Sequence, residues 1–224
     1  MSLDSTPIKP NIDLGKKEVL YCREYIDYEK IDKNPRKREY LIRTMMRGCH
    51  VLDRLGVKYA VGRGTALGFN RERGFLPTDI DIDIDVFGDE QVYQIIRRLP
   101  FDELFVTSSN GHYQQFAFLD KETNVIFDLY FYYLTSGCWI NRNYFGYHWL
   151  PADKYEKLGA FPFEGFDFPA PDLDWYCSFW YGDNWRTPKK YDKTWSEYYQ
   201  NDCKGFIYLG EKDIVNERLF EIPR

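Results

Sequence analysis

Four aspartates alternate with aliphatic residues in one short stretch of the chain. From Asp79 to Val86 the sequence is Asp-Ile-Asp-Ile-Asp-Ile-Asp-Val, the period of a β-strand in which alternate side chains share a face. Neighbouring carboxylates would lie ~6.6 Å apart and repel each other by roughly 2 kcal/mol at an effective dielectric constant of about 20. A divalent cation would remove this repulsion, and Mg²⁺ prefers carboxylate oxygens. The stretch therefore predicts a metal site on its acidic face.

Three other interpretations of the acidic row stay open. It could be a solvent-facing sheet edge whose charges discourage aggregation. A calcium loop of the EF-hand type would place Glu90 at its twelfth position, but it needs glycine at the sixth, where Ile84 stands. The Asp-x-Asp motif of a nucleotide-sugar glycosyltransferase also holds a metal and a diphosphate. The residues on either side favour metal-dependent phosphoryl or nucleotidyl transfer.

A glycine-rich turn precedes the acidic strand and supplies groups that could bind phosphate. The segment from Gly62 to Thr65 lies between a predicted strand and the start of a helix, where backbone amides are unpaired and glycine permits close approach. Two arginines follow on or just after that helix, although arginines there also suit a solvated helix face. The candidate phosphate-binding residues are Gly62, Arg63, Gly64, Thr65, Arg71 and Arg73.

A third carboxylate interrupts a later apolar stretch. Asp128 stands inside the segment 125–130, Val-Ile-Phe-Asp-Leu-Tyr. A lone carboxylate among such residues is costly to bury unless it is paired or bound to metal. A structural aspartate with satisfied hydrogen bonds is the other interpretation. We therefore take Asp81, Asp83 and Asp128 as the candidate catalytic residues.

The elements that must position these residues follow from periodicity and capping signals. Helices are expected at 34–55, where Gly56 would form the C-cap, at 65–73, at 90–99, near 171–181 and near 192–200. Strands are expected at 57–61, 79–86, 103–108, 113–119 and 125–134. Aromatic-rich short strands follow, with a hairpin over 159–171 that turns near Glu164-Gly165. This order predicts an α/β (α+β) fold with a small mixed sheet flanked by helices. Residues 1–33 are expected to form an N-terminal arm, 34–190 the domain, and 191–224 an extension packed on it.

Composition limits the class of protein. The 224 residues carry 30 Lys+Arg and 35 Asp+Glu, a formal charge of −5, which argues against broad electrostatic binding to nucleic acid. No apolar run approaches the ~20 residues of a membrane span, and the N-terminus lacks the apolar core of a signal peptide, so we expect a cytoplasmic protein. The five scattered cysteines favour buried thiols over disulfides. The 42 aromatic residues are expected to form the core, with an aromatic cage for a quaternary ammonium group as the alternative.

Two segments resemble one family of transferases. The first is Gly64-Thr65-Ala66-Leu67-Gly68, then Arg71, Gly74-Phe75-Leu76-Pro77 and the acidic strand. The second is 181–188, Tyr-Gly-Asp-Asn-Trp-Arg-Thr-Pro. In this order they resemble the LicD family, which includes bacterial phosphocholine transferases, is similar to fukutin and fukutin-related protein, and has a polymerase-beta-like nucleotidyltransferase fold.

The resemblance implies a Mg²⁺- or Mn²⁺-dependent transferase. Such enzymes move phosphocholine or a polyol phosphate from a CDP-linked donor to a sugar hydroxyl of a glycan or glycolipid, such as lipopolysaccharide or teichoic acid, at times beside the inner membrane face. By position, Asp79, Asp81 and Asp83 match the metal-binding run. The second segment supplies the candidate substrate-binding residues Tyr181, Asp183, Trp185 and Arg186. Many members carry Trp-Asp-Asp-Asp-Ile-Asp where this chain has Thr-Asp-Ile-Asp-Ile-Asp, and Asp85 is an addition.

Two rival functions remain beside this one. A nucleotidyltransferase would add NMP from an NTP and release pyrophosphate. A non-catalytic calcium- or glycan-binding module would prefer Ca²⁺ to Mg²⁺ and would not respond to nucleotides.

Overall fold

The fold of residues 32–88, 91–109, 112–135, 137–143, 146–188 and 203–208 is described from a computed structural model. The helix expected near 192–200 and most of the predicted N-terminal arm and C-terminal extension lie outside these residues. The described helices are α2 (Lys37–Leu55), α3 (Arg63–Glu72), α4 (Val92–Arg98) and α5 (Leu173–Tyr181), with a 3₁₀ turn, η2, at Ala152–Tyr155. Gly56 ends α2 in the left-handed conformation (φ 64°), as its position predicted.

In the described part of the chain, eight strands form one mixed sheet, and two more form a separate hairpin. The sheet contains β1 (Tyr59–Val61), β2 (Asp81–Phe87), β3 (Asp102–Ser109), β4 (His112–Asp120), β5 (Val125–Thr135), β6 (Cys138–Asn143), β7 (Gly146–Pro151) and β10 (Phe206–Tyr208). The hairpin pairs β8 (Gly159–Phe163) with β9 (Phe166–Ala170) and turns at Glu164 and Gly165, both with positive φ. The expected fold class, an α/β protein with a mixed sheet flanked by helices, is therefore confirmed.

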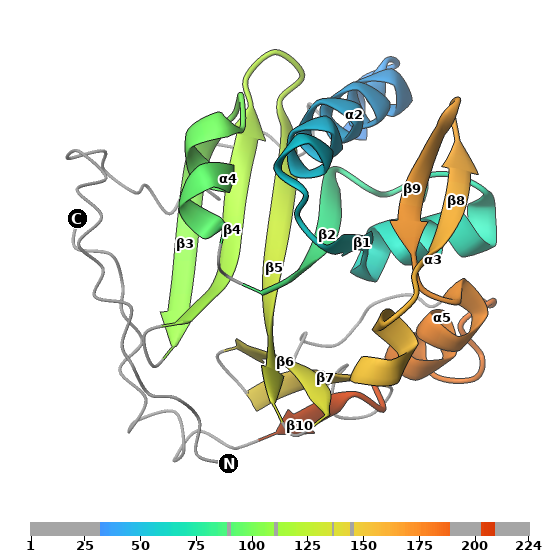
Figure 1. The fold of residues 1–224 in the computed structure, drawn as a ribbon. Coiled ribbons are helices and arrows are strands. Elements are labelled where there is room, and N and C mark those ends of the chain that lie inside the picture. The colour runs from blue at the N-terminus through green and yellow to red at the C-terminus, as the bar shows by residue number, and fades with distance from the viewer. Residues whose placement is uncertain are drawn as a thin grey trace.

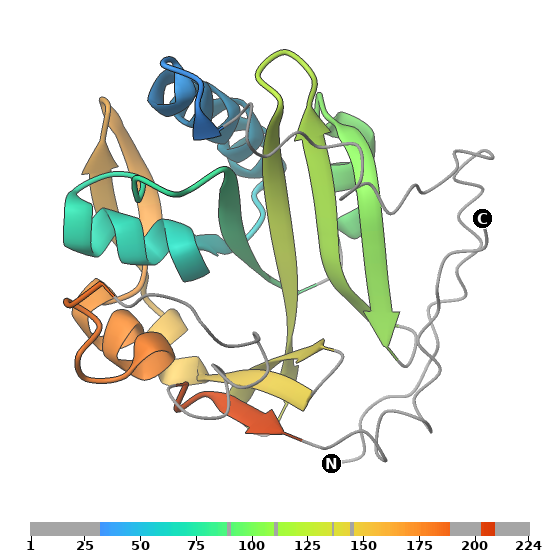
Figure 2. The same ribbon diagram turned by 180° about the vertical axis from the view of Figure 1, so that it is seen from behind.

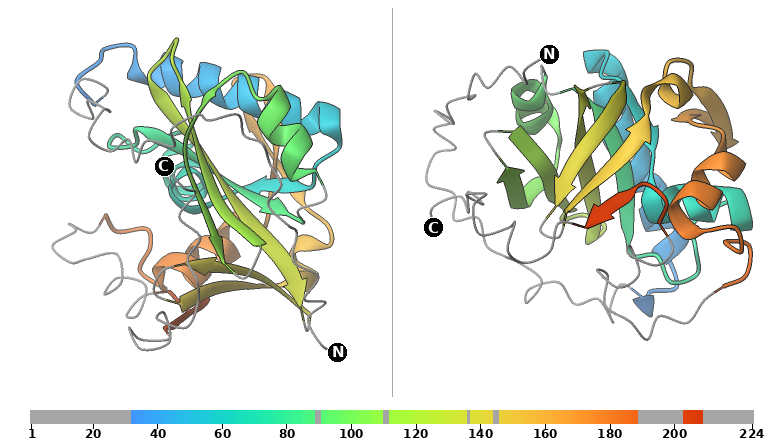
Figure 3. Two further views of the ribbon diagram at one scale, coloured as in Figure 1. Left: turned by 90° about the vertical axis from the view of Figure 1, so that its left-hand side faces the viewer. Right: turned by 90° about the horizontal axis from the view of Figure 1, so that it is seen from below.

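The long strand β5 pairs with three other strands and so connects the two parts of the sheet. Its first part lies between β2, to which it is parallel, and β4, to which it is antiparallel. Its last residues, 133–135, pair instead with β6, which leads to β7 and β10. Figure 1 shows α2 beside the upper end of β5 and α4 in front of β3 and β4. Figure 2, from behind, shows α3 beside β2, with α5 below α3. Figure 3 shows β6, β7 and β10 as a second layer below the main strands. No helix in the described ranges is long and apolar enough to cross a membrane.

Aromatic side chains fill much of the core, as the composition predicted. Phe69 of α3 stacks on Phe161 of the hairpin, with ring centroids 4.6 Å apart, and also contacts Phe163 and Phe168. The fully buried side chains include Trp180, Tyr132, Tyr155, Tyr176, Phe116, Phe118, Phe127 and Phe131. Phe166, at the hairpin turn, is instead exposed. The aromatic residues therefore fill the core both between α3 and the hairpin and along the strands β4 and β5.

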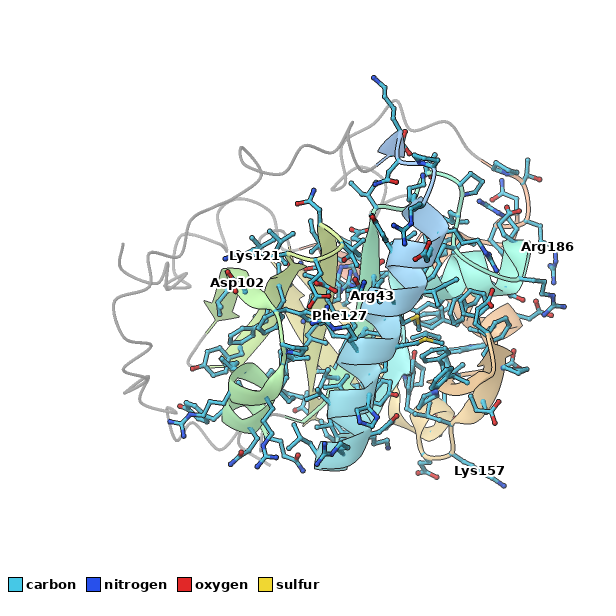
Figure 4. The ribbon with its side chains drawn as sticks, turned by 90° about the horizontal axis from the view of Figure 1, so that it is seen from above. Arg43, Asp102, Lys121, Phe127, Lys157 and Arg186 are labelled. Carbon is cyan, nitrogen blue, oxygen red and sulfur yellow. The ribbon has the colours of Figure 1, made fainter. Side chains whose placement is uncertain are left out.

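Helix α2 packs closely against β5 at Gly48. A Cβ atom at this position would lie 2.4 Å from Cζ of Phe127, whose ring is fully buried between α2 and the sheet (Figure 4). We expect Gly48→Ala to destabilise the protein by about 1–3 kcal/mol through overpacking, measured by urea denaturation. His50→Ala, on the exposed face of the same helix, is the control and should change stability by less than about 0.5 kcal/mol. Equal or higher stability of Gly48→Ala would contradict the packing described.

Candidate metal and phosphate site

Three carboxylates from two neighbouring strands converge at one point. Asp81 and Asp83 lie on β2 and Asp128 on β5, and each offers an oxygen within 4.8 Å of those of the other two. The parallel pairing of the strands places Asp83 directly opposite Asp128. Side chains opposite each other in a sheet point to the same face. The convergence thus follows from the strand register, and it involves the same three residues as the predicted catalytic set.

The ionised carboxylates of this cluster destabilise one another. Burial raises the pKa of Asp81 well above its usual range, and the charges of Asp83, Asp128 and Asp79 raise it further. Burial also raises the pKa of Asp83, but the Arg63 guanidinium and the Gly64 amide partly offset this effect. The chemistry of the three carboxylates is that of a site for a hard divalent cation, because all three candidate ligand atoms are oxygens.

Two hydrogen bonds join the glycine turn, residues 62–65, to the acidic strand β2. The Gly64 amide donates to Oδ2 of Asp83 at 2.9 Å, and the Asp83 amide donates to the Thr65 hydroxyl at 2.9 Å. A Cβ atom on Gly64 would lie 3.0 Å from Oδ2 of Asp83, and one on Gly62 would lie 2.6 Å from the carboxyl carbon of Asp85. Both glycines are therefore required for close packing against carboxylates, and the Gly64 amide, predicted to face phosphate, contacts Asp83.

The two outer aspartates of the row lie in different surroundings from the central pair. Asp79 precedes β2, and its Oδ2 accepts a hydrogen bond from the Leu76 amide. Burial, followed by the charge of Asp83, raises the pKa of Asp79 to about 7. Asp85 is completely buried and accepts a hydrogen bond from the Tyr176 hydroxyl of α5 at 3.3 Å. Neither belongs to the group of three converging carboxylates.

The structure separates the three candidate arginines. Arg63 is buried, with its guanidinium 3.6 Å from the centre of the Tyr130 ring, 4.9 Å from that of Trp180, and its Nε 4.0 Å from Asp85. Arg71 is partly buried, and its positive charge lowers the pKa of Asp79. Arg73 is exposed and ends α3 in the left-handed conformation. Arg71 therefore combines partial access with proximity to the acidic row.

The segment 181–188 packs against α3 rather than standing free. Trp185 is buried, and its carbonyl oxygen lies 3.5 Å from Nη1 of Arg71. Asp183 accepts hydrogen bonds from Ser178 and Lys204, and Arg186 forms an ion pair with Asp174 while lying over the Trp185 ring. Figure 4 shows Arg186 at the edge of the molecule. Among the candidate substrate-binding residues of this segment, Trp185 is thus linked to α3 through Arg71, whereas Arg186 points outward.

Sequence reasoning missed two polar residues at the cluster, Gln115 and Tyr130. Nε2 of Gln115 on β4 lies 3.2 Å from Oδ1 of Asp128 and 3.2 Å from the Tyr130 hydroxyl. A hydrogen bond from Tyr130 in turn lowers the pKa of Asp83. The only sequence signal was that Gln114 and Gln115 interrupt a run of aromatic and aliphatic residues. That signal does not say which glutamine faces the acidic strand.

Comparison with known proteins identifies a matching family. The family described as "LicD/FKTN/FKRP, nucleotidyltransferase domain" matches residues 56–172, more than half of the chain. The matched segment contains the glycine turn, all of β2 and Asp128. Among curated proteins, none matches the chain by sequence.

One solved structure resembles the fold at a distance. It is the solution structure of the antibiotic-resistance factor ANT(2'')-Ia, with 13% sequence identity and a TM-score of 0.46. The similarity covers 80% of this chain and 89% of that one.

Proposed function

The chain belongs to the LicD/FKTN/FKRP nucleotidyltransferase family, and from this premise we propose that it is a metal-dependent phosphotransferase. The proposed reaction moves a phospho-alcohol, such as phosphocholine or a polyol phosphate, from a CDP-linked donor to a sugar hydroxyl of a glycan or glycolipid. The sugar oxygen forms a bond to the donor's outer phosphorus, the bond to the bridging oxygen breaks, and CMP leaves. The observation that carries the proposal is the convergence of Asp81, Asp83 and Asp128 beside a glycine turn.

The residues present fit a divalent cation. Three carboxylate oxygens within 4.8 Å of one another form a hard, anionic donor set, and burial penalises the charges of Asp81 and Asp83 in the absence of a counterion. Asp81 and Asp83 would hold Mg²⁺ or Mn²⁺, with Asp79 close enough for its charge to act on Asp81. When bound, the cation would neutralise the donor diphosphate and stabilise charge on the leaving phosphate.

The other residues would position the donor and manage charge. Asp128 would complete the site and could accept the proton of the attacking hydroxyl. The turn with Gly64 and Thr65 would hold Asp83 in place through its two hydrogen bonds. Arg71 is the arginine we assign to the charge of departing CMP, because Arg63 is engaged between buried rings and Arg73 is exposed at the end of α3.

Product analysis tests the proposal against its closest rival. The purified protein would be incubated with CDP-choline, CDP-linked polyols or CTP, each with Mg²⁺ and a panel of glycan acceptors, and the products separated by anion-exchange chromatography. Acceptor-dependent release of CMP from a CDP-linked donor is the expected result. Pyrophosphate release from CTP would instead support NMP transfer, to which the family's nucleotidyltransferase domain is also suited.

A matched pair of variants ties the products to the site. Asp128→Asn should abolish CMP release, whereas Asp167→Asn, at an exposed position of β9, should retain it. CMP release that persists in Asp128→Asn, or that proceeds equally in excess chelator, would overturn the proposed function.

A further inference from the structure

Gln115 donates hydrogen bonds to Asp128, one of the converging aspartates, and to the Tyr130 hydroxyl. On β4 it lies directly opposite Tyr130 of β5, and Ala117 lies opposite Asp128, so Gln115 is the diagonal neighbour of Asp128. Long side chains reach across such a diagonal. Its Nε2 atom is 3.2 Å from Oδ1 of Asp128 and 3.2 Å from the Tyr130 hydroxyl. One amide group therefore contacts both residues.

The chemistry of the neighbours fixes which end of the amide faces them. An ionised carboxylate only accepts hydrogen bonds, so the amide group facing Asp128 must be the NH₂ group, which has two protons to give. One proton goes to Asp128 and the other to the Tyr130 oxygen. Tyr130 is then left with its own hydroxyl proton, which it donates to Asp83. Gln115 therefore donates directly to Asp128, and it acts on Asp83 through the Tyr130 hydroxyl.

The Tyr130 ring has a second partner that limits its movement. The Arg63 guanidinium lies 3.6 Å from the ring centre and also contacts the Trp180 ring at 4.9 Å. Arg63 belongs to the first turn of α3, next to Gly64, whose amide holds the other side of Asp83. Asp83 is thus held from the glycine turn and from Tyr130, and Gln115 donates a hydrogen bond to Asp128.

We propose that Gln115 is a positioning residue of the carboxylate site, acting with Tyr130 to hold Asp128 and Asp83 at the spacing that a divalent cation requires. The inference rests on the proposed metal-dependent function. Groups that orient ligating carboxylates without touching the metal commonly contribute 10- to 100-fold to metal affinity. Gln115 has the donor type, the strand position and the two contacts that such a role needs.

Metal titration of the full chain tests this role directly. Binding of Mn²⁺ would be followed by electron paramagnetic resonance, which reports the free ion and requires no turnover. In Gln115→Met, which keeps the length of the side chain but removes both donors, the dissociation constant for Mn²⁺ is expected to rise about 10-fold or more. Gln114→Met is the matched control, because Gln114 is the neighbouring glutamine of the same strand and is itself buried. It should leave Mn²⁺ affinity within about twofold of the wild type.

A second variant separates positioning from folding. Tyr130→Phe keeps the ring under Arg63 but removes the hydroxyl, and it should weaken Mn²⁺ binding in the same direction as Gln115→Met. If the two residues act as one unit, the double variant should lose less affinity than the product of the two single losses. The Tyr130→Phe measurement stands even if Gln115→Met does not fold.

The outcomes distinguish this inference from the proposed function. Wild-type affinity for Mn²⁺ in Gln115→Met and Tyr130→Phe would overturn the positioning role and leave the metal site intact. A loss of affinity in Gln114→Met equal to that in Gln115→Met would also overturn it, because the effect would then be general loss of structure. Absence of Mn²⁺ binding by the wild type would overturn the proposed function and, with it, the positioning role.

Discussion

Asp81→Asn is expected to abolish transfer and, at the same time, to raise the melting temperature of the metal-free protein. Burial and three neighbouring carboxylates oppose ionisation of Asp81. Asparagine has the same shape without the charge, so the repulsion of roughly 2 kcal/mol between adjacent carboxylates is relieved. We expect the melting temperature in chelator at pH 8 to rise by about 5 °C in calorimetry. Transfer should fall by at least ~1,000-fold, about 4 kcal/mol in the barrier, because a ligand of the metal is lost.

Asp83→Asn provides the internal comparison. Asp83 accepts from the Gly64 amide, and the charge of Arg63 compensates its own. Asp83→Asn should therefore abolish transfer to the same extent as Asp81→Asn. It should give no gain in melting temperature, because the buried positive charge of Arg63 would then be less well neutralised. Two results would contradict this prediction: a lower melting temperature of the metal-free Asp81→Asn protein, or retention of its transfer activity. Either would show that a cation does not act by relieving repulsion between the carboxylates.

The metal-free protein is expected to lose stability as the pH rises from 6.5 to 8. Asp79 and Asp85 each have a pKa raised to about 7, mainly by burial, whereas aspartate in an unfolded chain has a pKa of about 3.9. In this window the folded state holds protons that the unfolded state has already released, so unfolding becomes easier as the pH increases. The two groups together should cost about 1–2 kcal/mol, or roughly 4 °C in melting temperature.

The lower limit of this pH range is set by a buried histidine, and one substitution and one ion serve as controls. His148 is buried and its pKa is lowered, so below about pH 6.5 its protonation in the unfolded state opposes the effect. Asp79→Asn retains an oxygen for the Leu76 amide but does not titrate, and it should remove about half of the slope. Saturating Mg²⁺ should flatten or reverse the slope, since cations compete with protons for the carboxylates. A melting temperature in chelator that is constant or higher at pH 8 would contradict the raised pKa values.

The acidic strand shows what the sequence could predict of the site. Strict alternation of Asp with Ile or Val placed the carboxylates on one face, and a lone Asp in an apolar strand identified Asp128. Both signals are local, because a period of two and an isolated charge can be recognised within a few residues. Their convergence also needed the parallel register of β2 and β5, which the order of elements only suggests.

The parts of the site that were not predicted depend on contacts between distant segments. Asp85 follows the same alternation as Asp83, yet it faces Tyr176, which lies 91 residues later in the chain on α5. The three arginines are equivalent in sequence terms, and only the packing of Arg63 between Tyr130 and Trp180 separates them. Such contacts are set by tertiary packing, which leaves no periodic pattern in the sequence.

The start of β2 shows a smaller effect of the same kind. The alternation begins at Asp79, but the strand begins at Asp81. The Asp79 carboxylate instead accepts from the Leu76 amide three residues earlier and closes a turn. Short polar side chains compete in this way with regular pairing of the backbone, so strand boundaries next to aspartate shift by a few residues.

The binding of CDP by isothermal titration calorimetry, with and without Mn²⁺, tests the central claim most directly. If Asp81, Asp83 and Asp128 hold a cation against the donor diphosphate, wild-type protein should bind CDP tightly only in the presence of Mn²⁺. Asp128→Asn should lose this metal-dependent binding, while Asp167→Asn should keep it. Equal affinity for CDP with and without Mn²⁺, or unchanged metal-dependent binding in Asp128→Asn, would contradict the account.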